Sequence, residues 1–253
     1  MPKKTLRSRI QKILRQIQFA FIKFGFSNYR NIFIQYQPDS KVHFDQHSEF
    51  EQLSQKFTAE NQKNNGGDIS RLWSLMLNLK QLEEQGVQGD FAELGVWRGN
   101  TAAVLAHYAK QQGRQVFLFD TFEGFNANDL KGVDQKHVEG AFQNTSVELV
   151  RSIVGHVDCS HIVQGYFPES LQPEHAERTY SAVSLDCDLY EPMKAGLAFF
   201  YPRMPKGGIF FLHDYSSHYW PGSKQAIDEF CAEHGVYIVL MPDKSGSAFF
   251  RKQ

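Results

Sequence analysis

Apolar residues recur at helical spacing between residues 69 and 85, and this pattern predicts an amphipathic helix. Asp68 is placed to cap its first turn, and Gly86 follows the last turn as a helix stop. We expect this helix to open the main domain with one buried face. That face carries Leu72, Leu75, Met76, Leu79 and Leu82.

From residue 90 onward, short apolar runs alternate with helical patterns. The predicted strands span residues 91–96, 116–120, 161–165, 182–188, 208–214, 236–241 and 248–251. The predicted helices span residues 101–112, 145–154, 192–204 and 224–234, the second opened by a capping box of Thr145 and Glu148. Such alternation predicts an α/β fold with a doubly wound, mostly parallel sheet covered on both faces. Because the last two strands are joined by a short turn, one of them must run antiparallel.

The first strand leads into a glycine turn that can hold a ligand. Gly95 and Gly99 allow the backbone to approach a ligand closely, and Asn100 is placed to cap the following helix. Phosphate is the usual ligand of such a turn, because the helix N-terminus offers free N–H groups. The acidic Glu93 at the strand end instead favours ribose hydroxyls or a cationic ligand.

An acid also closes the second strand. Asp120 is suited to accept hydrogen bonds from both hydroxyls of a ribose, the role of an acid in dinucleotide folds. The alternative for Asp120 is a helix cap or a residue that orders its loop. The alternative for Glu93 is a salt bridge at the strand end.

A third group of polar residues ends the fourth and fifth strands. Asp186 and Asp188 are two apart and share one face of a predicted strand, while His213 and Asp214 follow its predicted neighbour. Three carboxylates at one rim repel each other unless a cation binds, and oxygen ligands suit Mg²⁺. The alternative is that one or two of these acids cap helices. His213 alone is compatible with a ligand, a base or a structural histidine.

Other side chains near these strand ends are less informative. Cys187 has no base paired with it in sequence and is expected in the core. The aromatic residues that follow either line a sugar or ring pocket or form a lid that packs on itself. They are Tyr190, Tyr215, His218, Tyr219 and Trp220.

The N-terminal part differs from the rest. Residues 1–23 carry Lys and Arg but no acid, with apolar residues at helical spacing, which predicts a basic amphipathic helix. We expect it to pack on its own domain or on a second subunit of a homo-oligomer; the alternative is peripheral contact with a membrane. The polar, glycine-ended stretch at residues 61–67 predicts a boundary between an extension, residues 1–67, and the main domain, residues 68–253.

Composition narrows the class of protein. Hydrophobic residues make up 42% of the 253 residues, which is enough for a sizeable core. The net charge is −1, and a nucleic-acid partner is not expected without a basic surface. Three scattered cysteines and the lack of a signal-peptide pattern predict a cytoplasmic protein without disulfides.

The motifs together resemble class I S-adenosylmethionine-dependent methyltransferases and, more narrowly, the macrocin O-methyltransferase (TylF/MycF) family. The matching stretches lie between residues 89 and 230: GDFAELGVWRGN, FLFDTFEGF, GYFPESL, SLDCDLYEPMKAGLAFFYPRMPKGG and HDYSSHYWPGSKQAIDEF. The resemblance implies a Rossmann-like sheet of seven strands whose last strand is antiparallel and lies between the fifth and sixth. It implies S-adenosylmethionine as cofactor and a sugar hydroxyl of a glycosylated metabolite or glycan as acceptor, with Mg²⁺ present.

The resemblance also assigns roles to residues. It implies that the cofactor is contacted by Glu93, Gly95, Gly99, Asp120, Thr121 and Phe122, with Asp120 at the ribose hydroxyls. It implies that Asp186 is a metal ligand and the general base, and that Asp214 is a second metal ligand. His213 stands where the family usually has an acid, so we expect weaker binding of Mg²⁺ or a preference for a transition metal.

The sequence leaves two other classes of protein open. An NAD-dependent or sugar-nucleotide-modifying enzyme of the Rossmann type uses a similar turn, but the turn between Gly95 and Gly99 lacks the G-x-G-x-x-G spacing. A non-catalytic nucleoside-binding protein of the same fold would not need the acids at 186 and 214.

Overall fold

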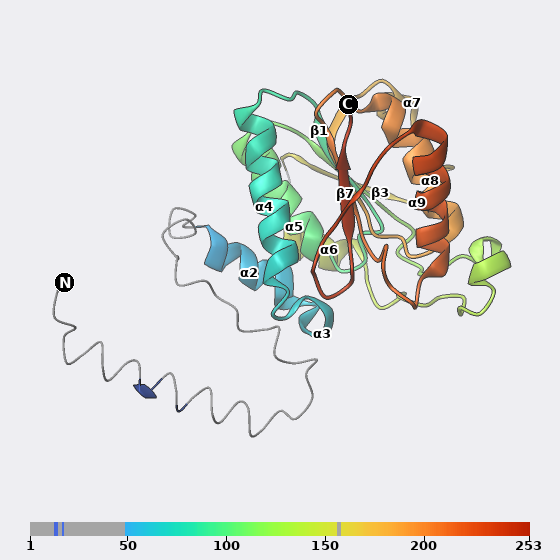
Figure 1. Ribbon diagram of the computed structural model, residues 1–253, viewed down its shortest axis with the longest axis horizontal. Helices are drawn as coiled ribbons and strands as arrows, with labels where there is room; N and C mark the ends of the chain where they lie inside the picture. Colours follow the sequence, from blue (N-terminus) through green and yellow to red (C-terminus); the bar gives the residue numbers. More distant parts are fainter. Residues whose placement is uncertain (1–12, 15–16, 18–48, 156–157) are drawn as a thin grey trace. The chain divides into compact units, whose positions relative to one another are not determined.

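A computed structural model of the chain describes residues 13–14, 17, 49–155 and 158–253 (Figure 1). Contacts divide the chain into two units, residues 1–48 and residues 49–253. In the first unit, Ile13, Leu14 and Ile17 are helical and exposed. The rest of the predicted basic helix at residues 1–23 lies outside the described residues, so its packing, oligomer and membrane contacts stay predictions.

Among the described residues, seven strands form one sheet in the order β3-β2-β1-β4-β5-β7-β6. Strands β1 to β5 pair in parallel, whereas β7 runs antiparallel to both of its neighbours, β5 and β6. This confirms the predicted mostly parallel sheet with its last strand reversed and inserted between the fifth and sixth. The strands are β1 Asp90–Leu94, β2 Val116–Asp120, β3 Ser160–Gln164, β4 Tyr180–Leu185, β5 Ile209–Leu212, β6 Val239–Leu240 and β7 Ala248–Arg251.

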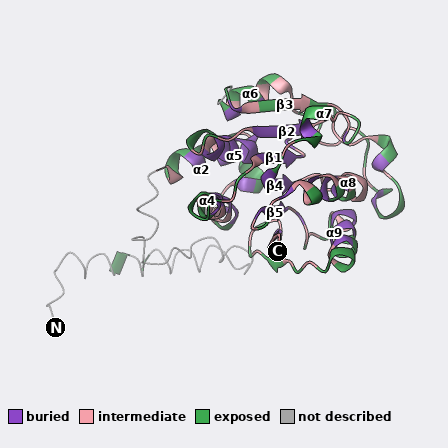
Figure 2. Cartoon of the chain, turned by 90° about the horizontal axis from the view of Figure 1, so that it is seen from above, coloured by how far each residue is buried: buried purple, intermediate pink, exposed green. Residues whose placement is uncertain are grey.

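Helices cover both faces of this sheet (Figure 2). One buried core lies under α2 Phe50–Ala59, α4 Ile69–Glu84, α5 Asn100–Gln111 and α6 Val147–Val154. The other lies under α8 Tyr190–Phe200 and α9 Pro221–His234. The described residues also form two single-turn α-helices, α3 Gln62–Asn65 and α7 Pro173–Ala176, and short 3-10 helices at Ala127–Asp129, Gly132–Asp134 and Tyr201–Arg203. In the part of the chain that the structure describes, no helix is long and apolar enough to cross a membrane.

Helix α4 forms where the apolar spacing predicts it. The Asp68 carboxylate accepts a hydrogen bond from the Arg71 backbone N–H at 3.4 Å, and Gly86 follows the helix at a φ of 65°. All five predicted apolar positions are buried. Because full burial of such a side chain contributes about 1.5–3 kcal/mol, this face fixes α4 against the sheet.

Two predicted helix caps are wrong, and α8 and α9 begin before the predicted residues 192 and 224. Gly99, at a φ of 81°, is the N-cap of α5, and the Asn100 side chain already lies in the helix and donates to the Lys56 carbonyl at 2.8 Å. Helix α6 begins at Val147 because the Ser146 hydroxyl accepts from the Leu149 N–H at 3.1 Å. The Thr145 hydroxyl instead donates to the Trp97 carbonyl, so the predicted capping box does not form.

The stretch at residues 61–67 is more ordered than its composition indicates. Asn61 caps helix α3, and the Asn65 amide donates to the Phe57 carbonyl at 2.8 Å. Leu53 and Phe57 of α2 belong to the same core as α4 and α5. Helices α2 and α3, which we placed in the N-terminal extension, therefore pack within the compact unit of residues 49–253. The domain division at residue 67 stays a sequence-based prediction.

Candidate active site

A cavity of about 870 Å³ opens beyond the carboxyl ends of the parallel strands. In open α/β sheets this is where ligands bind. Most of the residues predicted for the site line it: Glu93, Gly95, Asp120, Thr121, Asp186, Asp188, His213 and Asp214. Gly99 and Phe122 are not among the lining residues. Gly99 packs against Val150 of α6, and the Phe122 side chain is buried in the core.

Gly95 brings the glycine turn against the loop after β4. Its φ is 86°, and a Cβ atom there would lie 2.2 Å from the carbonyl oxygen of Asp186. Any side chain at this position would push the two strand ends apart. The lack of a side chain at residue 95 therefore allows the glycine turn to lie directly against the loop that carries Asp186.

Asp120 orders the glycine turn in this structure. One carboxylate oxygen accepts from the backbone N–H groups of Val96 and Trp97, both at 2.7 Å, and the other accepts from that of Phe122 at 2.7 Å. Burial raises the pKa of Asp120, and these three N–H groups oppose the rise. The loop-ordering alternative thus describes what Asp120 does here. Because a carboxylate oxygen has two lone pairs and Oδ1 accepts a single one of these hydrogen bonds, Oδ1 can still accept from a hydroxyl, and the ribose role stays a prediction.

Glu93 is a buried carboxyl that lacks a full set of partners. The Ser184 hydroxyl donates to Oε1 at 3.4 Å, while Oε2 is buried without a hydrogen bond. Burial, followed by the nearby charge of Asp186, raises the pKa of Glu93 well above its ordinary value. No ion pair involves Glu93 among the described residues, so the salt-bridge alternative is not what forms. A ligand cation next to Oε2 would stabilise the ionised form.

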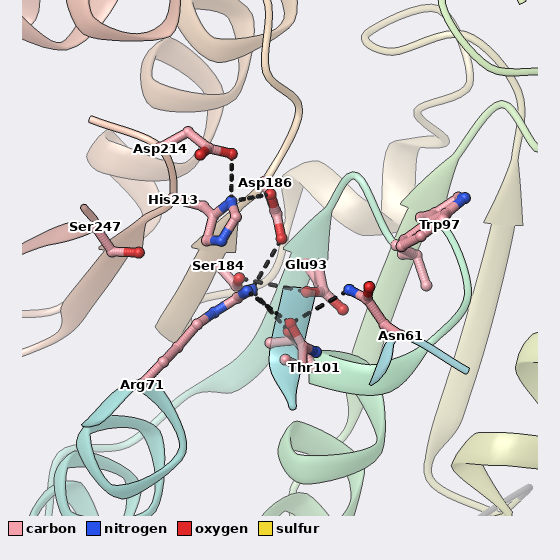
Figure 3. Close-up of polar contacts among 12 residues, drawn as sticks. Asn61, Arg71, Glu93, Trp97, Thr101, Ser184, Asp186, His213, Asp214 and Ser247 are labelled. Carbon is pink, nitrogen blue, oxygen red and sulfur yellow. Dashed lines mark hydrogen bonds and ion pairs between the residues drawn. The ribbon is translucent and has the colours of Figure 1, made fainter. Parts of the chain in front are cut away.

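Asp186 lies between two cationic side chains (Figure 3). Its Oδ2 is 2.9 Å from Nη2 of Arg71, and its Oδ1 is 2.5 Å from Nδ1 of His213. Burial on its own raises the pKa of Asp186, but the charges of His213 and Arg71 outweigh it and hold the pKa at about 2. Asp186 is therefore ionised at neutral pH.

His213 bridges two carboxylates, because its Nδ1 is also 2.6 Å from Oδ2 of Asp214. Burial and Arg71 lower the pKa of His213, but Asp186 and Asp214 outweigh them and raise it to about 10. Burial and the charges of Asp214 and Asp186 raise the pKa of Asp188 well above its ordinary value. The imidazolium thus supplies part of the positive charge that these acids need.

The four polar side chains after β4 and β5 lie close together, as the sequence indicates, but a loop and not a shared strand face brings them there. Ligand atoms of Asp186, Asp188, His213 and Asp214 all lie within 4.8 Å of one another. Strand β4 ends at Leu185, so Asp186 and Asp188 follow the strand and do not share one of its faces. Asp188 and Asp214 both have positive φ angles, 62° and 58°, and this loop geometry brings the carboxylates together.

This donor set fits a divalent cation. Three carboxylates and one imidazole offer oxygen and nitrogen ligands at one point, and two of the carboxylates repel each other in the absence of added positive charge. For Nδ1 of His213 to act as a ligand, the ring must first lose its proton. The metal role of Asp186, His213 and Asp214 stays a prediction.

Arg71 is the site residue that we did not predict. It lies on α4, and its side chain is only 8% exposed. Besides Asp186, Nη2 donates to the Thr101 hydroxyl at 3.0 Å. Arg71 precedes Leu75 by four residues and so lies at the edge of the apolar face of the helix. An arginine in that position was the available signal, because a charge on a buried face requires a partner.

The cavity lining holds two kinds of side chain. Residues of α3 and of the loops beside it contribute amide and ammonium groups: Asn61, Lys63, Asn64 and Lys244. Loop residues elsewhere contribute rings: Trp97, Phe125, Phe142, Tyr219 and Trp220. Phe125 and Phe142 each lie within 6 Å of Trp220, measured between ring centroids. Cys187 also lines the cavity, and burial raises the pKa of its thiol well above its usual range, which disfavours the thiolate form that a nucleophile needs.

The predicted aromatic group divides into two. His218, Tyr219 and Trp220 line the cavity, as the pocket interpretation requires. The hydroxyl of Tyr190 donates to Glu229 at 2.6 Å, and that of Tyr215 donates to Asp228 at 2.7 Å. These two tyrosines are bound to the surface of α9 and take no part in the wall.

The long loop between β2 and α6 is fastened over the cavity by one buried acid. Asp134 accepts a hydrogen bond at 2.7 Å from the N–H of Tyr190, the first residue of α8. A Cβ atom at Gly222, in the first turn of α9, would lie 2.0 Å from the same carboxylate. Because the N-terminus of a helix favours a negative charge, Asp134 anchors the loop that carries Phe125 and Phe142.

Comparison with known proteins gives consistent matches. A family model described as macrocin O-methyltransferase (TylF) matches residues 21–252. The mycinamicin III 3''-O-methyltransferase of Micromonospora griseorubida is 26% identical over 76% of this chain and 84% of its own length. The demethyldecarbamoylnovobiocin O-methyltransferase of Streptomyces niveus is 28% identical over 74% of this chain and 79% of its own.

A third relative is the 8-demethyl-8-(2,3-dimethoxy-alpha-L-rhamnosyl)-tetracenomycin-C 4'-O-methyltransferase of Streptomyces olivaceus. It is 26% identical over 72% of this chain and 73% of its own length. Among solved structures, the O-methyltransferase NovP superposes with a TM-score of 0.66 at 22% identity, covering 81% of this chain and 98% of its own. The calicheamicin methyltransferase CalS11 gives 0.58 at 23% identity, covering 85% and 94%. Both structures show the same fold.

Proposed function

The chain belongs to the macrocin O-methyltransferase (TylF) family of S-adenosylmethionine-dependent enzymes, and from this premise we propose that its acceptor is a sugar hydroxyl of a glycosylated small molecule or glycan. The names of two relatives support a sugar acceptor, because one acts on a rhamnosyl compound and the other on the 3'' position of a mycinamicin. The observation that carries the proposal is the position of Asp186. Asp186 faces the same cavity as the glycine turn, and its carboxylate lies 2.9 Å from the guanidinium of Arg71 and 2.5 Å from the ring of His213.

We assign the cofactor to the side of the cavity formed by β1 and β2. The uncompensated Oε2 of Glu93 suits the ammonium group of the methionine part, and Gly95 leaves room for it along the turn. Asp120 and Thr121 line the cavity next to the turn and suit the ribose. Gly99 and Phe122 act indirectly. Gly99 is the N-cap of α5, and the Phe122 N–H donates a hydrogen bond to the Asp120 carboxylate.

Methyl transfer requires an in-line approach of the acceptor oxygen to the methyl carbon. The oxygen–carbon bond forms as the carbon–sulfur bond breaks, and its electron pair stays on sulfur, leaving S-adenosylhomocysteine. Fixed orientation of the two reactants supplies much of the acceleration. The amide side chains in the cavity lining offer hydrogen bonds for a sugar, and the aromatic rings there offer an apolar surface for the rest of the acceptor.

We propose that Asp186 receives the hydroxyl proton. A carboxylate with a pKa near 2 is a weak base toward a neutral sugar hydroxyl. That proton becomes strongly acidic once its oxygen carries the methyl group, so it passes to Asp186 as the new bond forms. In the ground state, Asp186 orients the hydroxyl by accepting its hydrogen bond.

We further propose that a divalent cation is held by Asp186, His213 and Asp214, with Asp188 in reach. When bound, it supplies Lewis acidity and a fixed template for two neighbouring sugar oxygens. Arg71 already neutralises one oxygen of Asp186, which leaves Oδ1 facing the other ligands. Turnover measured with and without EDTA tests this, and a full rate in the chelator would contradict a metal at the rim.

The acceptor class is tested by transfer of an isotope-labelled methyl group from S-adenosylmethionine. The panel pairs each glycoside with its aglycone and with a glycoside whose free hydroxyls are already methylated. We expect label on the free glycosides alone, detected by mass spectrometry. Label on the aglycones, or on none of the panel, would overturn the assignment of a sugar acceptor.

A further inference from the structure

The charges around the cavity leave one part of the cofactor without an obvious partner. Seven carboxyl groups of the described residues line the cavity: Glu93, Asp120, Asp129, Asp186, Asp188, Asp214 and Asp243. They suit the sulfonium and ammonium groups of S-adenosylmethionine. The methionine part also carries a carboxylate, which these acids repel, so it requires a cation close to Glu93 and the glycine turn.

Among the described residues that line the cavity, the Lys and Arg side chains are Lys63, Arg71 and Lys244. Nζ of Lys244 donates to the carbonyls of Lys63 and Gly66, at 3.3 and 2.9 Å. Lys63 is exposed to solvent. Neither lysine is held toward the glycine turn, which leaves Arg71 as the candidate.

Arg71 is buried next to the residues that we assign to the methionine part. Its guanidinium lies between Thr101 in the first turn of α5 and Asp186 at the rim (Figure 3). Nη2 makes both of these contacts, at 3.0 and 2.9 Å, whereas Nη1 makes a long one of 3.5 Å to Asn65. A guanidinium has five N–H donors, so Nη1 retains capacity for a stronger acceptor.

We propose that Arg71 binds the carboxylate of the methionine part of the cofactor through Nη1 while Nη2 holds Asp186. This inference rests on the proposed placement of the cofactor at the glycine turn. A ligand carboxylate is a stronger acceptor than the Asn65 amide, because charge-assisted hydrogen bonds are about twice as strong as neutral ones. One arginine then fixes the position of the cofactor relative to the proton acceptor.

The proposal explains why an arginine is buried at this point of α4. A buried cation whose sole task was to neutralise Asp186 would duplicate His213, which contacts the other oxygen of Asp186 at 2.5 Å. The planar fork of arginine can engage two separate carboxylates at once, which the point charge of a lysine does less well. Arg71 thus connects α4 to both halves of the site.

A thermodynamic cycle on ligand and protein tests this. Isothermal titration calorimetry measures Kd for S-adenosylhomocysteine and for its decarboxylated analogue, which lacks that carboxylate alone. We expect the wild type to bind S-adenosylhomocysteine about 10- to 100-fold more tightly than the analogue. In Arg71→Met the ratio of the two Kd values should fall to about one, because losing the guanidinium weakens binding of the ligand that carries the carboxylate and not of the analogue.

Arg114→Met is the matched control. Arg114 donates to the Gly89 carbonyl at 2.7 Å and to the Ser181 hydroxyl at 2.9 Å, at the opposite ends of β1 and β4. Its loss removes another partly buried arginine and should leave the ligand preference unchanged. Arg71→Lys keeps the charge but not the fork, and we expect an intermediate preference.

The outcomes separate the two proposals. A preference that persists in Arg71→Met, or that is absent from the wild type, overturns the role of Arg71 while the cofactor site stands. Failure of the wild type to bind S-adenosylhomocysteine overturns the cofactor placement as well. If Arg71→Met does not fold, the Arg71→Lys comparison decides, and an undiminished preference there contradicts the proposal.

Discussion

Glu93 is a buried acid and Asp186 a partly buried one at the ends of two neighbouring strands, yet their surroundings give them opposite properties. Glu93 pairs in register with Ser184, two residues before Asp186. Burial raises the pKa of Glu93 well above its usual value, whereas His213 and Arg71 outweigh burial and hold that of Asp186 at about 2. Position at a strand end therefore does not decide the charge of an acid. The partners decide it, and Arg71 is 115 residues away from Asp186 in sequence.

The contrast suits the roles that we propose. On the turn side, Glu93 retains an oxygen without a hydrogen bond and can take up a cationic group from a ligand. On the rim side, Asp186 is compensated by side chains of the protein itself and stays ionised before any ligand binds. The first region is completed by the cofactor, and the second is prepared for the acceptor.

The largest effect on stability is expected where the glycine turn contacts the loop after β4. In Gly95→Ala, the new methyl group would overlap the Asp186 carbonyl at a positive φ. We expect a loss of about 2–5 kcal/mol in the free energy of unfolding, from the overlap and from backbone strain. S-adenosylhomocysteine binding should be lost with it.

Chemical denaturation with and without S-adenosylhomocysteine measures this change. Gly113→Ala is the matched control, because its φ is 65° but nothing lies within 4 Å of the added atom. It should cost about 1–2 kcal/mol from strain alone and leave ligand binding intact. Equal losses in the two variants would show that contact between the turn and the rim is unimportant.

Replacing Glu93 should sharpen the contrast in pH dependence. Because its pKa is raised, the folded state holds this proton more tightly than the unfolded state. Stability is therefore lost as pH rises above the ordinary value of 4.5. Glu93→Gln removes that loss, so we expect a gain of about 1–3 kcal/mol at pH 8 and no change at pH 4. S-adenosylhomocysteine affinity should fall about tenfold.

Thermal unfolding across this pH range, with Glu233→Gln as the exposed control, provides the measurement. Asp186 should behave in the opposite way. Its contribution to stability is present above the ordinary value of 3.8 and is lost as pH falls toward about 2. A Glu93→Gln variant that is less stable than wild type at pH 8 would contradict this assignment of charges.

A smaller effect is expected from the residue that departs from the family pattern. His213→Asp replaces a charged imidazolium between Asp186 and Asp214 with a third oxygen ligand. We expect Mg²⁺ to bind about tenfold more tightly to this variant, because Mg²⁺ prefers oxygen ligands. Calorimetric titration with Mg²⁺ measures the change, and weaker binding in the variant would mean that the imidazole of His213 suits the ion at this site better than a third carboxylate does.

Local patterns were sufficient for most of the fold. Residues 116–120 form β2 with the predicted bounds because VFLFD is a continuous apolar run that needs burial on both faces. Helix α4 followed from apolar spacing alone. The cap of α5 did not, because the choice between Gly99 and Asn100 depends on the φ of residue 99, which a pattern of residue types does not contain.

The sequence likewise predicted part of the site and missed the rest. The motifs brought Glu93, Gly95, Asp120 and Asp186 to one cavity, because the carboxyl ends of parallel strands meet at one edge. They did not show that the oxygens of Asp120 are already bound by three backbone N–H groups. Arg71 was not predicted because its partners come from other elements of the fold. Helix α3 is a single turn, and contacts with other elements stabilise it more than its own helix propensity does.

We propose that cofactor binding and activation of the acceptor belong to different sides of one cavity. Asp186→Asn tests it when turnover and the Kd for S-adenosylhomocysteine are measured in the same preparation. Asp228→Asn serves as the control, since Asp228 lies on the surface of α9 and contacts Lys224 and Tyr215. We expect turnover of Asp186→Asn to fall about 100- to 10,000-fold while the Kd stays within about threefold of wild type. Unchanged turnover, or a parallel loss of binding and turnover, would contradict the claim.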